Sequence, residues 1–212
     1  MSMSDTTPLT GEPLALDLVN TRPSTGDLLD SPARLKAWLA LQADRLPAEE
    51  AGIIEADNTE VEITEADVAA VQAVREQIAA AVHAVLHDQA PPAKALRSLN
   101  ESQRAAPAVR ELAWNGSGVV AAPRRDGPLG TRLAAILAEA AADLLTDPAL
   151  GKVRQCEAED CVMVFLPAHP RRRWCSPARC GNRARVARYY RRHKAGEPAG
   201  GHLDDQAGDR EV

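Results

Sequence analysis

The chain has 212 residues, a formal net charge of −5, 45% hydrophobic residues and only 3% aromatic residues. This length fits one large or two small domains, and the scarcity of aromatic residues favours packed helices over a sheet sandwich. Apolar runs fall short of the roughly 20 residues that span a bilayer, and the first residues lack the pattern of a signal peptide. We therefore expect a cytoplasmic protein that does not enter membranes.

The first half of the chain predicts helices. Residues 1–13 are polar, and we expect them to be flexible. The apolar segment 14–21 fits both strand and helix spacing, and we favour a helix. Ser31-Pro32 is a typical helix start, and the apolar spacing that follows predicts one helix ending near Pro47. The longest predicted helix begins at Thr64, with Asp67 placed to complete its cap, and continues to residue 87.

The second half predicts two further helices and a hairpin. Residues 92–104 form a short amphipathic segment. Asn115-Gly116 and Ser117-Gly118 separate two short apolar segments, which is typical of a β-hairpin over about 110–122. Residues 129–145 show a clear helical repeat. The whole is predicted to be α+β and predominantly helical.

Composition changes abruptly near residue 151. Residues 152–194 contain twelve Lys or Arg and three acidic residues, whereas residues 1–151 carry a net charge of −10. A change of this kind is typical of a domain boundary. We therefore expect a helical domain over 14–150, a basic module over 151–194 and a disordered acidic tail over 195–212. The basic module would create a local positive field despite the acidic whole.

All four cysteines lie in the basic module. Cys156 and Cys161 form one Cys-x4-Cys pair, and Cys175 and Cys180 form a second pair after a loop of thirteen residues. Two close pairs of thiolates are typical of a structural zinc site, so we predict one Zn²⁺ per chain with four protein ligands and no open position. Disulfides or redox chemistry, or another metal, remain the alternatives.

A basic helix is predicted over about 181–194. On a helical projection Val186, Ala187 and Tyr190 share one side, which we expect to pack on the metal core, while arginines occupy the other. Arginine binds phosphate oxygens and guanine edges through paired hydrogen bonds, so nucleic-acid contact is the favoured interpretation. A solvated face, or pairing with acidic parts of the same chain, are the alternatives. The predicted contacts are Arg171, Arg172, Arg173, Arg183, Arg185, Arg188, Arg191, Arg192 and Lys194.

The helical domain offers a weaker candidate site. Asn20, Thr21, Arg75, Asn100 and Trp114 could line a pocket for a small-molecule effector, or could be buried polar residues that fix the fold. Arg75 lies mid-helix among apolar residues, so it must extend to solvent, bind an anionic ligand or pair with a carboxylate such as Asp17.

Several of these motifs resemble a known family. Arg154-x-Cys156-x4-Cys161, then Arg172-Arg173-Trp174-Cys175-Ser176, and Cys180-Gly181-Asn182-Arg183 are similar to the CGNR zinc finger. Residues 14–21 resemble the opening motif of the ABATE domain that precedes it, and Val74-Arg75-Glu76 and Leu99-Asn100 resemble later landmarks. The family comprises bacterial proteins described as stress-induced transcription regulators. The loop at residues 166–170 departs from the family pattern, which usually has Asp, Ser and Asn there.

The resemblance implies a zinc-binding, DNA-binding regulator whose N-terminal domain dimerises or senses a ligand. Because one short helix contacts few base pairs, binding of specific double-stranded DNA would ordinarily require a homodimer. The alternative is an RNA-binding or protein-interaction module that uses the same basic surface. We expect Gly181 to adopt a backbone shape that other residues avoid and Asn182 to cap the basic helix. Nucleotide-binding and hydrolase motifs are not found, so no enzymatic activity is expected.

Overall fold

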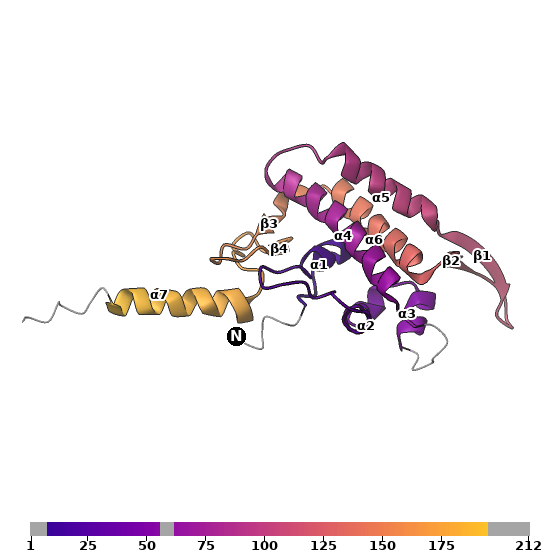
Figure 1. The fold of residues 1–212 in the computed structure, drawn as a ribbon, viewed down its shortest axis with the longest axis horizontal. Helices are drawn as coiled ribbons and strands as arrows, with labels where there is room; N and C mark the ends of the chain where they lie inside the picture. Colours follow the sequence, from indigo (N-terminus) through magenta and orange to yellow (C-terminus); the bar gives the residue numbers. More distant parts are fainter. Residues whose placement is uncertain (1–7, 56–61, 195–212) are drawn as a thin grey trace, which may run out of the picture.

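The computed structural model describes residues 8–55 and 62–194 (Figure 1). Part of the expected flexible start, and all of the expected acidic tail, lie outside the described residues. The helices are α1 (Leu14–Val19), α2 (Pro32–Ala40), α3 (Ala48–Glu55), α4 (Glu65–Leu86), α5 (Ala93–Ala105), α6 (Leu129–Thr146) and α7 (Asn182–Lys194). The strands are β1 (Val109–Trp114), β2 (Val119–Arg124), β3 (Arg154–Gln155) and β4 (Val164–Phe165), and the short helical turns are η2 (Ala43–Arg45), η3 (Leu150–Lys152) and η4 (Pro177–Gly181). The predicted fold class is confirmed.

Helices α4, α5 and α6 pack side by side, and α1 lies against α4 and α6 (Figure 1). Their apolar positions recur every three or four residues, so each helix buries one stripe in a shared core. Val71 and Ile78 of α4, and Leu133 and Leu137 of α6, are completely buried there. No helix in the described parts of the chain is long and apolar enough to cross a membrane.

The starts of α4 and α6 touch each other. Thr64 and Asp67 form the predicted capping box, in which the Thr64 hydroxyl accepts from the Asp67 N–H and the Asp67 carboxylate accepts from the Thr64 N–H. The same Asp67 carboxylate also accepts from the Gly130 N–H at 2.6 Å. A Cβ atom at Gly130 would lie 2.7 Å from the Asp67 Cα, so this approach requires glycine.

Helix α1 is buried on every side, which explains why its apolar spacing fitted two periods. Leu16 and Leu18 are both completely buried, between the helical core and β4. Asp17 is buried with them and accepts from the N–H groups of Gly11 and Glu12, and it pairs with Arg45 at 2.5 Å. Burial raises the pKa of Asp17, while the Arg45 contact opposes that rise.

The single helix predicted from residue 31 to Pro47 is wrong in its second half. Helix α2 ends at Ala40, and a separate helix, α3, begins after Pro47. The Pro47 carbonyl accepts the first α3 hydrogen bond, from the Ala51 N–H. Pro47 followed by acidic residues at 49 and 50 is a typical helix start. The prediction used Pro47 only as the end of the preceding helix.

The predicted hairpin is present and extends away from the helices (Figure 1). In this ribbon, formed by β1 and β2, Trp114 is opposite Val119 and Leu112 is opposite Ala121. These pairs share one face, because residues directly opposite each other in an antiparallel ladder point the same way. Every residue of the two strands is exposed, including Leu112 at 75% and Trp114 at 69%. The ribbon therefore presents an uncovered apolar face.

Candidate metal centre and basic helix

The four cysteine side chains converge on one point. Their Sγ atoms all lie within 4.8 Å of one another, and none forms a disulfide. The Sγ atom of Cys180 lies 3.5 Å from that of Cys175 and 3.7 Å from that of Cys161, and the Cys161 and Cys175 Sγ atoms are 3.9 Å apart. A tetrahedron with zinc–sulfur bonds of 2.3 Å has edges of about 3.8 Å. The donor set therefore fits a four-coordinate metal ion with sulfur ligands.

Each cysteine pair is held by a backbone turn. In the first turn the Cys156 N–H donates to the Met163 carbonyl across the β3–β4 ladder, and the Cys161 N–H donates to the Ala158 carbonyl. Asp160 has a φ of 60°, which short polar residues tolerate better than most. The Cys175 N–H donates to the Cys156 sulfur at 3.3 Å. These hydrogen bonds orient both pairs toward a common centre.

The second turn shows how two local expectations differ from the structure. The turn η4 leads directly into α7, so the capped end is the start of η4. Ser176, and not Asn182, provides that cap, because the Ser176 hydroxyl accepts from the Arg179 N–H. Asn182 is the first residue of α7, and its side chain accepts from Arg185 at 3.3 Å. Gly181 has no left-handed backbone; its Cβ would lie 3.3 Å from the Trp174 ring, so close packing explains the glycine.

Hydrogen bonds among the cysteines shift the pKa values of their thiols in different directions. A hydrogen bond with Cys161 lowers the pKa of the Cys156 thiol, whereas that same contact raises the pKa of Cys161. Hydrogen bonds with Cys156 and Cys161 raise the pKa of Cys175. Four thiolates at these distances repel one another, so a bound cation is needed to hold all four in the charged form.

Segments far apart in sequence hold the metal centre against the helical core. The Asn20 side chain donates to the Val164 carbonyl at 2.8 Å and accepts from the Val164 N–H at 2.9 Å. Glu12 accepts from the Leu166 N–H at 2.9 Å and pairs with Arg172 at 2.6 Å. Asn20 thus bonds to β4 as a neighbouring strand would. We name the contacts of Glu12 and Asn20 with the cysteine-containing module the interdomain clamp.

The predicted nucleic-acid contacts fall into two groups. In the first group, Arg172 donates to the Trp174 and Cys175 carbonyls and stacks on Phe165, so its contacts lie within the fold. Arg173 pairs with Glu157 at 2.5 Å, and Arg183 donates to the Glu159 carbonyl. The second group is exposed and contains Arg171, Arg185, Arg188, Arg191 and Arg192. The side chain of Lys194 lies outside the described ones.

Helix α7 extends away from the rest of the molecule (Figure 1). Its expected packing on the metal core is wrong: Val186 is 53% exposed, Tyr190 is 67% exposed, and Ala187 is exposed as well. Among the described helices and strands, only η4, directly before it, makes extensive contact with α7. The Tyr189 ring lies 4.1 Å from the His193 ring and 5.8 Å from the Tyr190 ring. The described side chains of the helix therefore present five arginines, no acidic residue and two tyrosines to solvent.

The five residues of the predicted N-terminal pocket are dispersed. Asn20 belongs to the interdomain clamp, and Arg75 is buried and donates to the Thr21 hydroxyl at 3.0 Å. Asn100 is exposed on α5, and Trp114 is exposed on the ribbon. This geometry provides no common pocket for the five residues.

The partner of Arg75 is Asp27, and not Asp17. Both guanidinium nitrogens of Arg75 donate to the Asp27 carboxylate, one of them at 2.7 Å. Burial opposes ionisation of Asp27, but the hydrogen bonds from Arg75 and the Leu29 N–H, together with the charges of Arg75 and Arg22, lower the pKa of Asp27 overall. Three residues that make these contacts, Asp27, Glu12 and Ser24, were not among the predicted site residues. The sequence signal that could have identified these three residues is their position in short polar segments next to α1, the most deeply buried helix.

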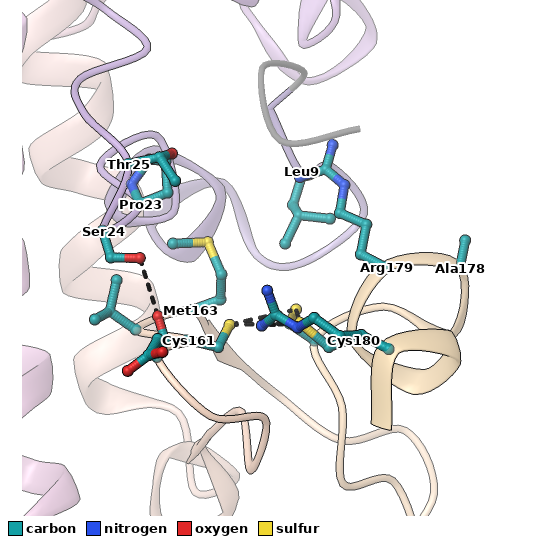
Figure 2. Close-up of a pocket in the computed structure, with 13 residues that line it drawn as sticks. Leu9, Pro23, Ser24, Thr25, Cys161, Met163, Ala178, Arg179 and Cys180 are labelled. Atoms are coloured by element: carbon teal, nitrogen blue, oxygen red, sulfur yellow. Dashed lines mark hydrogen bonds between the residues drawn. The ribbon is translucent and has the colours of Figure 1, made fainter. Parts of the chain in front are cut away.

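A cavity of about 320 Å³ lies beside the cysteines (Figure 2). Its walls come from Leu9, the 23–25 loop, and both cysteine-containing turns. The Ser24 hydroxyl donates to the Asp160 carbonyl at 2.9 Å across this junction (Figure 2). The cavity therefore lies between the helical part of the chain and the metal centre.

Two family models match the chain. Residues 12–148 match ABATE, described as "Putative stress-induced transcription regulator", and residues 152–193 match the CGNR zinc finger. No curated protein matches the chain. The resemblance inferred from the sequence is confirmed, and the cysteine cluster belongs to a zinc-finger module.

Proposed function

Because the chain belongs to the ABATE family and carries a CGNR zinc finger at residues 152–193, we propose that it is a zinc-dependent transcription regulator that binds double-stranded DNA through α7. The observation that carries this proposal is the exposure of α7, in which every residue from 185 to 193 is exposed. A basic helix that served the fold would bury a face or pair with acidic residues. The described arginines of α7 instead pair with no carboxylate of the described chain.

Zinc is the ion that the thiol geometry favours. Four sulfur donors in a tetrahedral arrangement suit Zn²⁺ or an iron–sulfur centre, and the zinc-finger family favours zinc. Cys156, Cys161, Cys175 and Cys180 would hold one ion per chain, with no open position for a catalytic water. The ion would fix η4, and η4 sets the direction in which α7 leaves the module. No enzymatic role is proposed.

The exposed arginines would contact the phosphate backbone and base edges. Arg185, Arg188, Arg191 and Arg192 are the main candidates on α7, and Arg171 is the candidate outside it. Arg172 is removed from the predicted set because its contacts lie within the fold. Phosphate contacts contribute most of the affinity and make it depend on salt.

The test is fluorescence anisotropy of a labelled DNA duplex titrated with protein over a salt series. The double variant Arg188→Gln and Arg191→Gln should weaken binding and lower the log–log salt slope by about one unit per arginine removed. Arg97→Gln, an exposed arginine on α5, should leave both quantities unchanged. Removing zinc with a chelator should abolish binding. Duplex binding that survives chelation, or that the double variant leaves intact, would contradict this assignment.

A second candidate function has its own observation. Tyr189 and Tyr190 are 59% and 67% exposed among the arginines, and aromatic rings beside arginine are typical of surfaces that stack unpaired bases. A single-stranded RNA in the same titration separates the two functions. Tighter binding to RNA than to the duplex, lost in Tyr189→Ala and retained in Arg97→Gln, would favour RNA.

The ribbon of β1 and β2 supports a homodimer. A two-stranded ribbon with both faces in water has little stability of its own, and an uncovered apolar face of this kind typically marks an interface. Leu112, Trp114 and Val119 lie on one flat face, which two copies can share around a two-fold axis. A second copy of the chain would thus cover the ribbon and supply the second basic helix that a two-part DNA site requires.

A further inference from the structure

The four cysteines differ in their access to solvent. Cys156, Cys175 and Cys180 are 5–7% exposed, whereas Cys161 is only partly buried. Two cavities reach Cys161. One is the cavity of about 320 Å³ beside the cysteines, and the other, of about 440 Å³, follows residues 155–162. A small reactant can therefore approach this sulfur from solvent without any unfolding.

The cavity of Figure 2 is lined by three of the cysteines, Cys161, Cys175 and Cys180. Of the other two, the Sγ atom of Cys180 lies nearer to that of Cys161 than the Sγ atom of Cys175 does, which is 3.9 Å away. Cys161 and Cys180 point toward each other across its floor, with their Sγ atoms 3.7 Å apart (Figure 2). The Arg183 guanidinium lies 3.6 Å from the Cys180 Sγ and also lines this cavity. A fixed positive charge beside sulfur stabilises both a thiolate and the negative charge that develops on an oxygen leaving group. The floor thus combines the partly exposed Cys161 sulfur, the Cys180 sulfur within reach of it and a cation beside Cys180.

We propose that Cys161 is an oxidation site for a hydroperoxide that enters through this cavity, and that Cys180 completes the reaction as the resolving thiol. The Cys161 thiolate attacks one peroxide oxygen, a sulfur–oxygen bond forms, the oxygen–oxygen bond breaks, and hydroxide leaves. The Cys180 thiolate then attacks the sulfenic sulfur, forming the disulfide and releasing a second hydroxide. Two thiolates lose two electrons, and the peroxide gains them.

The disulfide would remove two of the four metal ligands. This inference rests on the zinc ion proposed above for the four thiols. A zinc ion left with two protein ligands dissociates readily, because ligand number determines the stability of such sites. Cys180 lies in η4, immediately before α7, so oxidation would also release the anchored end of the basic helix. The site thus links peroxide exposure to the position of α7.

Ser24 provides a matched pair of variants, because its side chain lines both cavities that reach Cys161. Ser24→Ala removes the hydrogen bond to the Asp160 carbonyl and leaves both cavities open. Ser24→Leu removes the same bond and also adds a bulky group to both cavities. The two variants therefore differ in access to Cys161 and share the loss of the bond.

The experiment treats the zinc-loaded full chain with hydrogen peroxide and follows zinc release with a coloured chelator. Peptide mapping by mass spectrometry identifies the oxidised cysteines. We expect Ser24→Leu to release zinc several-fold more slowly than Ser24→Ala, and the mapped disulfide to join Cys161 and Cys180. A reductant and added zinc should restore the reduced, zinc-loaded protein. Zinc content measured before treatment shows that both variants are folded around the ion. A further variant, Ala178→Leu, narrows only the cavity of Figure 2 and tests access to Cys161 independently of Ser24.

Two results would overturn the inference alone. One is equal zinc release from Ser24→Leu and Ser24→Ala; the other is zinc release while Cys161 still reacts with an alkylating reagent as a free thiol. DNA binding by the reduced protein would remain intact in both cases, so the proposed function would stand. A chain that neither retains nor takes up zinc would overturn both proposals.

Discussion

At the scale of single residues, polar side chains of the helical domain are committed to internal contacts. Asn20 completes the hydrogen bonding of β4, and Arg75 is 2% exposed against Asp27. The sequence left Arg75 the choice of solvent, an anionic ligand or a carboxylate such as Asp17, because a guanidinium buried among apolar residues cannot remain unpaired. It could not identify that partner, since Asp27 lies 48 residues away in a loop whose position depends on tertiary packing.

Asp27→Asn tests the buried pair. The variant leaves the Arg75 charge without its counter-charge, and we expect it to lose about 3 kcal/mol of unfolding free energy at neutral pH, since Asp27 itself stays partly exposed. The folded-state pKa of Asp27 lies below its unfolded value near 4, so its contribution is present above about pH 4 and is lost as the pH falls through the folded pKa. Urea unfolding at neutral and acid pH should show the difference in stability between wild type and Asp27→Asn shrinking in acid.

The control is Asp30→Asn, at an exposed pair with Arg34, which should change stability little at either pH. A loss of stability in Asp27→Asn that is independent of pH would contradict the assignment.

At the scale of elements, two glycines should respond oppositely to the same change. Gly130→Ala would place a Cβ 2.7 Å from the Asp67 Cα, so the starts of α4 and α6 must separate, at a cost of about 1–3 kcal/mol. Gly52→Ala, within α3, meets no atom within 4 Å and should raise stability by about 0.4–1 kcal/mol, because alanine restricts the unfolded chain. Thermal unfolding of both variants provides the measurement. A Gly130→Ala protein as stable as the wild type would show that α4 and α6 are not in such close contact.

The sequence predicted the elements whose signals are local. The capping box at Thr64 and the turn at Asn115 depend on residues within a few positions, and both are present. The cysteine cluster was predictable because its spacing reflects the coordination chemistry. The prediction that failed depends on tertiary contacts. The two-faced pattern of α7 predicted that one side packs on the metal core, yet no element of the described chain covers Val186 or Tyr190. Amphipathic spacing shows that a helix can be partly buried, but a partner must be present to bury it.

At the scale of the whole molecule, the ribbon and α7 lie at opposite ends (Figure 1). If two chains associate through the ribbon, Trp114→Ser should shift sedimentation from dimer toward monomer, because it removes the largest apolar group from the shared face. Val120→Ser, on the other face of the same ribbon, is the matched control and should leave the dimer intact. Identical sedimentation of wild type and Trp114→Ser would exclude the ribbon as the interface.

The clamp formed by Glu12 and Asn20 has a consequence for protein engineering. Zinc fingers are often treated as cassettes that can be grafted from one protein onto another. Here a cassette cut at residue 151 would leave behind the side chains that bond to β4 and Arg172. A transplantable unit must therefore also include the segment that contains Glu12 and Asn20, even though more than 100 residues of intervening chain separate it from the cysteines.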